Sequence, residues 1–287
     1  MLEHVAKPSR WEMDAVSKIL APWRAFVRPV IFGGENIPAD RPLLFIGNHS
    51  LFAFFDSMFM FEELYFRHDI YLHALGDRAH FQVPVWREIM THFGVLEGTH
   101  EHAARLLGAG ECVLIFPGGA REAFKQRGET NQVIWKDRVG FARFAIRYGC
   151  PIIPFSAIGA DEIYRVVIDS PMIMKTPIGK AIAALGIRQD AILPIVRGVG
   201  PTLIPRRERV YIRFGKPIAT ANYGGHFDDL DAARELRDLV RDEVRRGIDA
   251  MMQYRETDPE RHRWPRLGEV FDNERRPDLI ATSADRI

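Results

Sequence analysis

The feature that most constrains the fold of this 287-residue chain is the alternation of short, continuous apolar runs with helical patterns. Amphipathic helical spacing occurs at residues 57–66, 83–92 and 138–149. Continuous apolar runs are typical of strands covered on both faces, so we predict an α/β fold with a mainly parallel or mixed central sheet flanked by helices. Ligands are then expected at the carboxyl ends of the strands. The predicted strands are LLFIG (43–47), IYLHAL (70–75), CVLIF (112–116), PIIPFSAIG (151–159) and RVYIRFG (209–215).

Three segments are expected along the chain. Residues 1–35 have the spacing of an amphipathic N-terminal helical segment, which Pro22 is expected to kink or split. Residues 36–225 form the α/β domain. Residues 226–287 hold a C-terminal helix and a charged tail without periodicity, which is either part of the same single domain or disordered. Two interpretations of the N-terminal segment remain open: it lies in a membrane interface, or it packs on the main core.

The composition argues against several classes of protein. A formal net charge of +1 disfavours a general nucleic-acid-binding protein, because such proteins need a basic excess or stripe. Cys112 and Cys150 each lie in or beside an apolar run, so a secreted disulfide scaffold is not expected. We recognise neither a signal peptide nor a window apolar enough to span a membrane. The expected location is the cytoplasm, either soluble or peripheral on a membrane.

His49 and Asp56 are the candidate catalytic pair. They stand in LLFIGNHSLFAFFD, where a predicted strand delivers the histidine to its end and the aspartate follows seven residues later. A histidine next to a carboxylate can take a proton from a hydroxyl, because its ordinary pKa of about 6.5 lies near the working pH. The alternative is an ordinary turn in which Asp56 caps the following helix.

The second candidate element is PGGARE, directly after the strand at 112–116. Two glycines there let the backbone pass close to a ligand, and the following arginine can bind an anion with both ends of its guanidinium. The alternative is a plain turn in which Arg121 pairs with a surface carboxylate. Arg138, at the start of a predicted helix, either binds an anionic donor or belongs to a solvated helix face. The candidate substrate-binding residues are Pro117, Gly118, Gly119, Arg121, Glu122 and Arg138.

Five sequence blocks follow one another along the chain: GNHSLFAFFD, GVLEGT (94–99), FPGGARE (116–122), GCPIIPF (149–155) and IRFGKPI (212–218). Their order is that found in glycerolipid acyltransferases. The chain resembles a bacterial member of the lysophospholipid acyltransferase superfamily, in the neutral-lipid branch of diacylglycerol acyltransferases and phytyl ester synthases. The resemblance implies that His49 is the general base, that Asp56 orients its imidazole, and that the second and third blocks bind acceptor and donor.

Three departures from the usual superfamily blocks bear on the site. The usual first block places the aspartate five residues after the histidine, whereas here it comes seven residues later. In the third block, usually FPEGTR-like, Gly118 replaces the glutamate and Ala120 the threonine. The second block lacks the arginine of phosphate-accepting members, which favours a neutral hydroxyl acceptor, although Arg121 leaves a phosphorylated acceptor open.

The resemblance implies an O-acyltransferase that moves a fatty acyl group from an acyl thioester, of CoA or acyl carrier protein, to the hydroxyl of a lipid. The acceptors considered are mono- or diacylglycerol, a long-chain alcohol, and lysophospholipid or glycerol phosphate. No cofactor and no metal are expected, and the N-terminal helix is expected to contact the cytoplasmic face of the inner membrane. Alternatives are a lipid ester or thioester hydrolase, metal-dependent hydrolysis at His100, Glu101 and His102, and a non-catalytic lipid-binding, membrane-docking protein.

Overall fold

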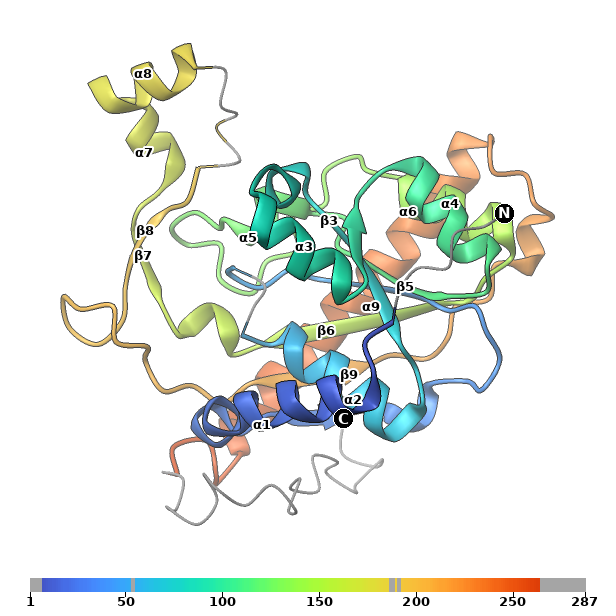
Figure 1. Ribbon diagram of the computed structural model, residues 1–287, viewed down its shortest axis with the longest axis horizontal. Helices are drawn as coiled ribbons and strands as arrows, with labels where there is room; N and C mark the ends of the chain where they lie inside the picture. Colours follow the sequence, from blue (N-terminus) through green and yellow to red (C-terminus); the bar gives the residue numbers. More distant parts are fainter. Residues whose placement is uncertain (1–6, 53–54, 186–188, 190–191, 264–287) are drawn as a thin grey trace.

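A computed structural model describes residues 7–52, 55–185, 189 and 192–263. Its centre is a seven-stranded sheet in the order β1-β9-β6-β2-β5-β3-β4. Every neighbouring pair is parallel except β6 and β9, so the predicted mixed α/β sheet is confirmed (Figure 1). The strands are β1 (Val30–Phe32), β2 (Leu44–Gly47), β3 (Leu72–Gly76), β4 (Val95–Glu97), β5 (Cys112–Ile115), β6 (Ile152–Ile158) and β9 (Tyr211–Phe214).

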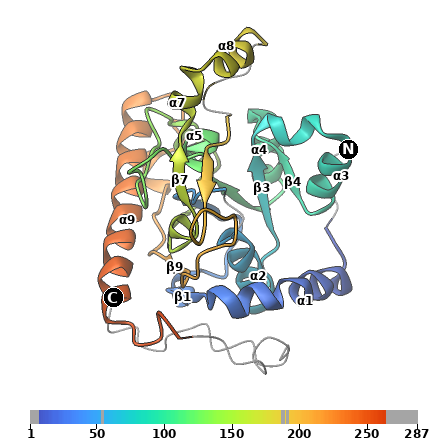
Figure 2. The ribbon, with the colours of Figure 1, turned by 90° about the vertical axis from the view of Figure 1, so that its left-hand side faces the viewer.

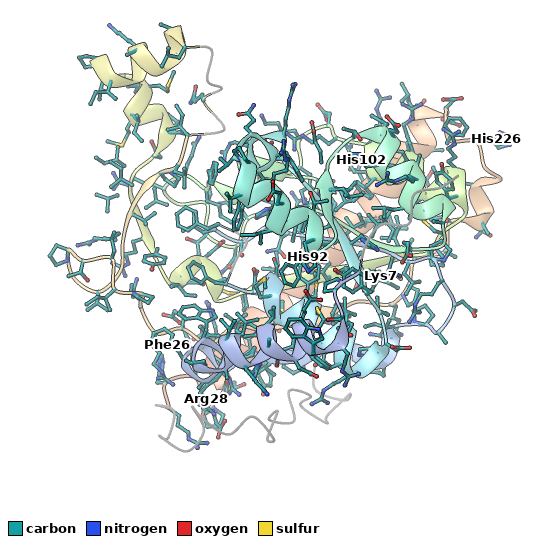
Figure 3. The ribbon with its side chains drawn as sticks, in the orientation of Figure 1. Lys7, Phe26, Arg28, His92, His102 and His226 are labelled. Atoms are coloured by element: carbon teal, nitrogen blue, oxygen red, sulfur yellow. The ribbon has the colours of Figure 1, made fainter. Side chains whose placement is uncertain are left out.

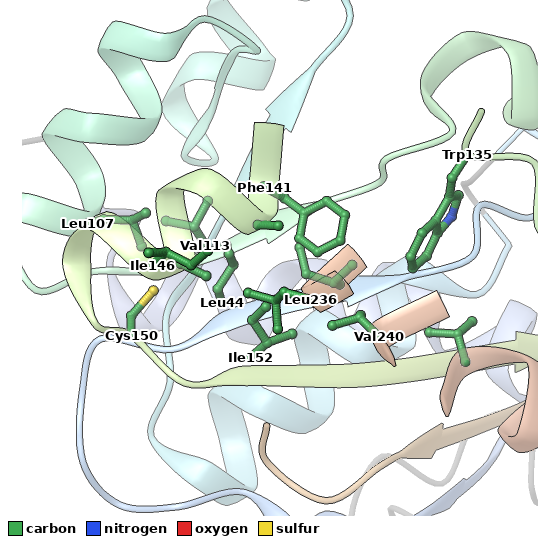
Figure 4. Packing of buried hydrophobic residues seen from close by; sticks show 14 of the residues in the cluster. Leu44, Leu107, Val113, Trp135, Phe141, Ile146, Cys150, Ile152, Leu236 and Val240 are labelled. Atoms are coloured by element: carbon green, nitrogen blue, oxygen red, sulfur yellow. The ribbon is translucent and has the colours of Figure 1, made fainter. Parts of the chain in front are cut away.

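Helices cover both faces of the sheet and divide the core into two clusters. Leu44 and Ile46 of β2 point to one cluster and Phe45 to the other, as strand geometry requires. The first cluster is closed by α4 (His100–Gly108), α6 (Gly140–Tyr148) and α9 (Leu230–Thr257), and Figure 4 shows part of its packing. The second is closed by α1 (Arg10–Val27) and α2 (Ser57–His68). Burial on both faces explains why these strands appear as continuous apolar runs.

The helix α1 is docked on the body of the protein. It runs through Pro22 without a break, so the expectation that Pro22 splits it is wrong. Its Arg24 forms a buried ion pair with Glu62 of α2. His92 of α3 (Pro84–His92), which Figure 3 labels above α1, lies 2.8 Å from Glu12. The inner face of α1 therefore packs on the core.

Residues 165–185, 189 and 192–207 belong to a projection that we call the arm. It contains a two-stranded sheet of β7 (Arg165–Ile168) and β8 (Ile195–Arg197), which carries the short helices α7 (Ser170–Met174) and α8 (Pro177–Ala184). Figures 1 and 2 show α8 standing away from the rest of the molecule. Sequence analysis predicted no helix or strand between residue 159 and residue 209.

The remaining helices are short. Among the described residues they include α5 (Gly119–Ala123) and the 3₁₀ turns at Gly34–Asn36, Arg78–Gln82, Ala160–Glu162 and Ala221–Tyr223. The predicted C-terminal helix is present as α9, which packs on β6, whereas residues 264–287 of the predicted tail lie outside the described residues. Among the helices that the structure describes, none has both the length and the apolar character needed to cross a bilayer.

Candidate functional site

The site is assembled at the carboxyl ends of three adjacent parallel strands. The central strand β2 pairs with β5 on one side and β6 on the other. His49 follows β2, the Pro117–Gly119 turn follows β5, and Asp161 follows β6. Gly47 permits this close approach, because a Cβ there would lie 2.4 Å from the carbonyl oxygen of Phe155 in β6.

The imidazole of His49 is held in one orientation by its own turn. Nδ1 lies 2.9 Å from the carbonyl oxygen of Ser50, and because a carbonyl can only accept, Nδ1 carries the proton. The ring packs against Phe116, with ring centroids 4.3 Å apart, and part of the residue remains exposed. Within the described part of the chain, Nε2 has no hydrogen-bond partner, so its lone pair is available as a base.

The surroundings of His49 keep it neutral. Burial lowers the pKa of His49 to about 4, and the positive charges of Lys125 and His80 act in the same direction, whereas the Ser50 carbonyl opposes them. The expectation that this histidine titrates near its ordinary value is therefore corrected. Its imidazole is already deprotonated at neutral pH.

Asp56 does not bond to the imidazole as the general-base hypothesis expected. Its carboxylate accepts hydrogen bonds from the Ser50 hydroxyl, at 2.7 Å, and from the backbone N–H of Ser57, also at 2.7 Å, where it caps α2. Burial raises the pKa of Asp56 and these hydrogen bonds lower it, with a net rise. Ser50 thus links the two residues, its carbonyl bonding to His49 and its hydroxyl to Asp56. The helix-capping alternative is what the structure shows.

The turn that carries His49 is tied to β6 and to the turn that follows it. The side-chain amide of Asn48 both donates to and accepts from the backbone of Ala157, each at 2.8 Å. The backbone N–H of Leu51 donates to Asp161 at 2.6 Å, and the ammonium of Lys125 lies 3.4 Å from the same carboxylate. Buried polar groups that are all hydrogen-bonded hold a loop rigidly, so these bonds fix the position of the turn that carries His49.

Arg138 contacts the glycine turn that follows β5. Nη1 of this exposed arginine donates to the carbonyl of Pro117 at 2.8 Å. Gly119 has a φ of +52°, and a Cβ there would lie 2.7 Å from the same nitrogen, so glycine is required. The N–H of Gly119 donates to Phe116 at 3.0 Å, which removes it from the groups available to an oxyanion and leaves that of Gly118.

Arg121 is engaged within the protein. Both ends of its guanidinium bond to Glu129, Nη1 at 2.9 Å from Oε2 and Nη2 to Oε1. The bidentate geometry that was expected to bind an anion is used in this structure on an internal carboxylate. Arg121 is thus a paired arginine, as in the alternative interpretation, with Glu129 as its partner.

Glu122, which was expected to bind substrate, is fully buried beneath the glycine turn. A Cβ on Gly118 would lie 2.0 Å from its Oε2, so the carboxylate fills the space where a side chain at position 118 would begin. Burial raises the pKa of Glu122 to about 7, against the opposing effects of Lys125 and the backbone amides of Ile134 and His49. Gly118, which stands where the usual block has glutamate, thus leaves space for the carboxylate of Glu122, one helical turn later.

A cavity of about 390 Å³ borders the His49 turn. Its lining includes Leu51 and Lys125, and also Arg165 and Val166 at the root of the arm. The cavity therefore connects the candidate site with the arm. Its other lining residues are Gln126, Arg127, Gly128, Thr130, Asp161, Glu162, Tyr164, Arg206 and Glu208.

Metal binding at the histidine-rich segment finds no geometric support. Across residues 7–52, 55–185, 189 and 192–263, no three His, Cys, Asp or Glu side chains are placed to share an ion. Nδ1 of His102 instead lies 2.8 Å from the carbonyl of Glu97.

Sequence analysis missed four residues of the site: Asn48, Ser50, Lys125 and Asp161. Asn48 and Ser50 flank the histidine, and a polar residue on each side of it in an apolar stretch is a usable signal. Lys125 and Asp161 stand 36 residues apart in the chain, and nothing local connects them.

The chain belongs to the diacylglycerol acyltransferase family. The family model described as diacylglycerol acyltransferase matches residues 39–224, nearly the whole of the predicted α/β domain. The expected resemblance is therefore confirmed. The fold is also that of the 1-acyl-sn-glycerophosphate acyltransferase PlsC from Thermotoga maritima, with a TM-score of 0.55 and 16% identity over 84% of this chain and 79% of that one.

The chain is also similar to proteins of eukaryotes. Phytyl ester synthase 2 of Arabidopsis thaliana is 32% identical over 81% of this chain and 35% of its own length. The human DGAT1/2-independent enzyme synthesizing storage lipids is 30% identical over 47% of this chain and 44% of its own. The chain thus spans about a third of the length of the phytyl ester synthases that it matches.

Proposed function

We propose that the protein is an O-acyltransferase that uses His49 as general base to acylate a lipid alcohol from a fatty acyl thioester. The observation that carries the proposal is the tautomer of His49. Its Nδ1–H is committed to the Ser50 carbonyl, and this leaves a basic Nε2 at the carboxyl end of the central strand. Membership of the diacylglycerol acyltransferase family supports this chemistry.

In the proposed reaction the alcohol O–H donates its proton to Nε2 while the alcohol oxygen attacks the thioester carbonyl. The tetrahedral intermediate then collapses with cleavage of the C–S bond, and the thiolate takes the proton back from the imidazolium. No covalent acyl-enzyme is formed. General-base assistance of this kind contributes roughly 10²- to 10⁴-fold, with further acceleration from positioning. The N–H of Gly118 is the candidate donor to the developing oxyanion.

We propose a neutral lipid alcohol as the acceptor. A phosphate headgroup taken from water needs compensating cations. The second block supplies no arginine, and Arg121 is already paired with Glu129. Arg138 remains exposed at the glycine turn, and we assign it to the anionic part of the thioester donor, CoA or acyl carrier protein.

The function is tested by incubating the purified protein with a labelled acyl-CoA and a mixture of diacylglycerol, a long-chain alcohol and a lysophospholipid. We expect label in the ester of a neutral alcohol. Label in the lysophospholipid would contradict the acceptor assignment, and release of free fatty acid alone would show a hydrolase.

The donor site is tested with two arginine variants. We expect Arg138→Ala to raise KM for acyl-CoA, because it removes an exposed cation from the glycine turn. The matched control is Arg121→Ala, which should lower stability without a comparable rise in KM, because that arginine serves Glu129. Equal effects on KM would contradict the assignment.

A further inference from the structure

The arm concentrates the exposed apolar side chains of this protein. Of the 17 large hydrophobic residues that are exposed in the described chain, nine lie between residues 167 and 204. Soluble proteins rarely leave such surface open unless it meets a partner or a membrane. On α8, Ile178 is 70% exposed, and Leu185 just beyond the helix is 77% exposed. The others are Val167, Met172, Leu193, Ile195, Val199, Leu203 and Ile204.

The charge of the arm is one-sided. The described residues of the arm, 165–185, 189 and 192–207, hold six lysine and arginine residues and a single acidic residue, Asp169. Lys175 and Lys180 stand between the exposed apolar positions of α7 and α8. Apolar side chains with interspersed cations are the composition of a segment that lies in the interface of an anionic bilayer, its lysines reaching to the headgroups.

The root of the arm borders the candidate site. Arg165 and Val166 of β7 line the same cavity as Leu51, which lies two residues after His49. Figure 2 shows α8 above the end of the sheet at which α5 begins, which is also the end that holds His49. An arm seated in a bilayer would therefore turn the cavity toward the lipids.

We propose that the arm is the membrane-docking surface of this protein and that it inserts α8 into the interface of an anionic bilayer. The inference rests on the proposed function, because the lipid acceptor would reach the cavity from the membrane at the root of the arm. It also moves the main membrane contact away from α1, whose inner face is occupied by the core. A second copy of the chain is disfavoured as the occupant, since two arms of the same charge repel.

The test is co-sedimentation of the full chain with vesicles of phosphatidylcholine and phosphatidylglycerol. The variants Ile178→Glu and Leu185→Glu alter exposed side chains, so the fold should be kept. Each should weaken partitioning about tenfold, because each removes a buried aliphatic side chain from the interface. The matched control is Ile19→Glu on α1, which is 76% exposed, and it should bind like the wild type.

Two further measurements separate docking from chemistry and test the part played by anionic lipid. With a water-soluble short-chain alcohol as acceptor, the arm variants should keep wild-type turnover. An inactive wild type that still binds vesicles through the arm would overturn the proposed function and leave the docking inference intact. Vesicles of phosphatidylcholine without phosphatidylglycerol should bind the wild type more weakly than the mixed vesicles, and this weaker binding should not depend on salt.

Three results would overturn the inference. Loss of vesicle binding by Ile19→Glu with normal binding by the arm variants would assign the contact to α1. Equal binding by all variants would show that neither surface is used. A wild-type dimer that Ile178→Glu converts to a monomer, without a change in vesicle binding, would assign the apolar face to a second copy.

Discussion

Glu122→Gln isolates the free energy of a buried carboxyl beneath the glycine turn. Burial raises the pKa of Glu122 from 4.5 to about 7. Below about pH 4.5 the group is neutral in the folded and the unfolded chain. Between pH 4.5 and 7 it is ionised only when the chain is unfolded, so the free energy of unfolding falls as the pH rises. Above pH 7 both states are ionised and the penalty stays constant.

The size of the effect follows from the pKa difference. At 1.36 kcal/mol per pKa unit, the wild type loses about 3 kcal/mol across this window. Glutamine has nearly the same shape and does not titrate. The free energy of unfolding of Glu122→Gln minus that of the wild type should therefore rise by about 3 kcal/mol from pH 4 to pH 8. Urea unfolding at a series of pH values measures this difference, in which the other groups cancel.

Glu129→Gln supplies a control of opposite sign. Although burial favours the neutral form of Glu129, its partner Arg121 and the backbone of Gln126 lower its pKa overall. Its contribution to stability is present above the unfolded pKa and is lost as the pH falls. The variant should thus lose stability relative to the wild type as the pH rises. A pH-independent difference for Glu122→Gln, or one with the sign of the control, would refute the account of the buried carboxyl.

Three further predictions follow from the geometry of the site. Gly118→Ala should lower the free energy of unfolding by about 1–3 kcal/mol, because its Cβ meets the Glu122 carboxyl. The control is Gly140→Ala, which should be neutral or slightly stabilising, because no atom lies within 4 Å of the added Cβ. Urea unfolding of both variants compares them, and an equal loss of stability in the two would contradict a clash between the Cβ at position 118 and Glu122. The variant Glu122→Gln removes the carboxyl whose pKa is about 7, so His49 is the group expected to limit kcat/KM at acid pH. Because the pKa of His49 is about 4, kcat/KM of this variant should show no acid limb near pH 6.5, and the base should be lost only below about pH 4. An acid limb near pH 6.5 would contradict the lowered pKa of His49. Asp161→Ala should lower the free energy of unfolding by roughly 3–5 kcal/mol in the same assay, because Lys125 and the backbone N–H groups of Leu51 and Asn131 lose their bonds to this carboxylate. A loss under 1 kcal/mol would contradict this role of Asp161.

The sheet was predictable because its strands are buried on both faces. A strand that is buried on both faces carries apolar side chains in succession, as in the runs CVLIF and PIIPFSAIG. The strands at Val30–Phe32 and Val95–Glu97 were missed, since three residues are too few to show a period. The arm was missed because its apolar residues face outward, where no packing imposes a regular spacing.

The site was predictable in its elements but not in its bonds. Strand ends placed His49 and the glycine turn correctly, because parallel neighbours share one edge of the sheet. The partners were set by tertiary geometry. Asp56, seven residues from His49, falls at the start of α2 and so bonds to Ser50 and the helix instead of the imidazole. Glu122 turns inward because Gly118 leaves the space open.

The most direct test of general-base catalysis is single-turnover acyl transfer by His49→Ala, with circular dichroism to verify the fold. We predict a loss of roughly 10²- to 10⁴-fold in the rate of ester formation with an unchanged fold, because Nε2 supplies the base. Ester formation at the wild-type rate by the folded variant would contradict the assignment of His49.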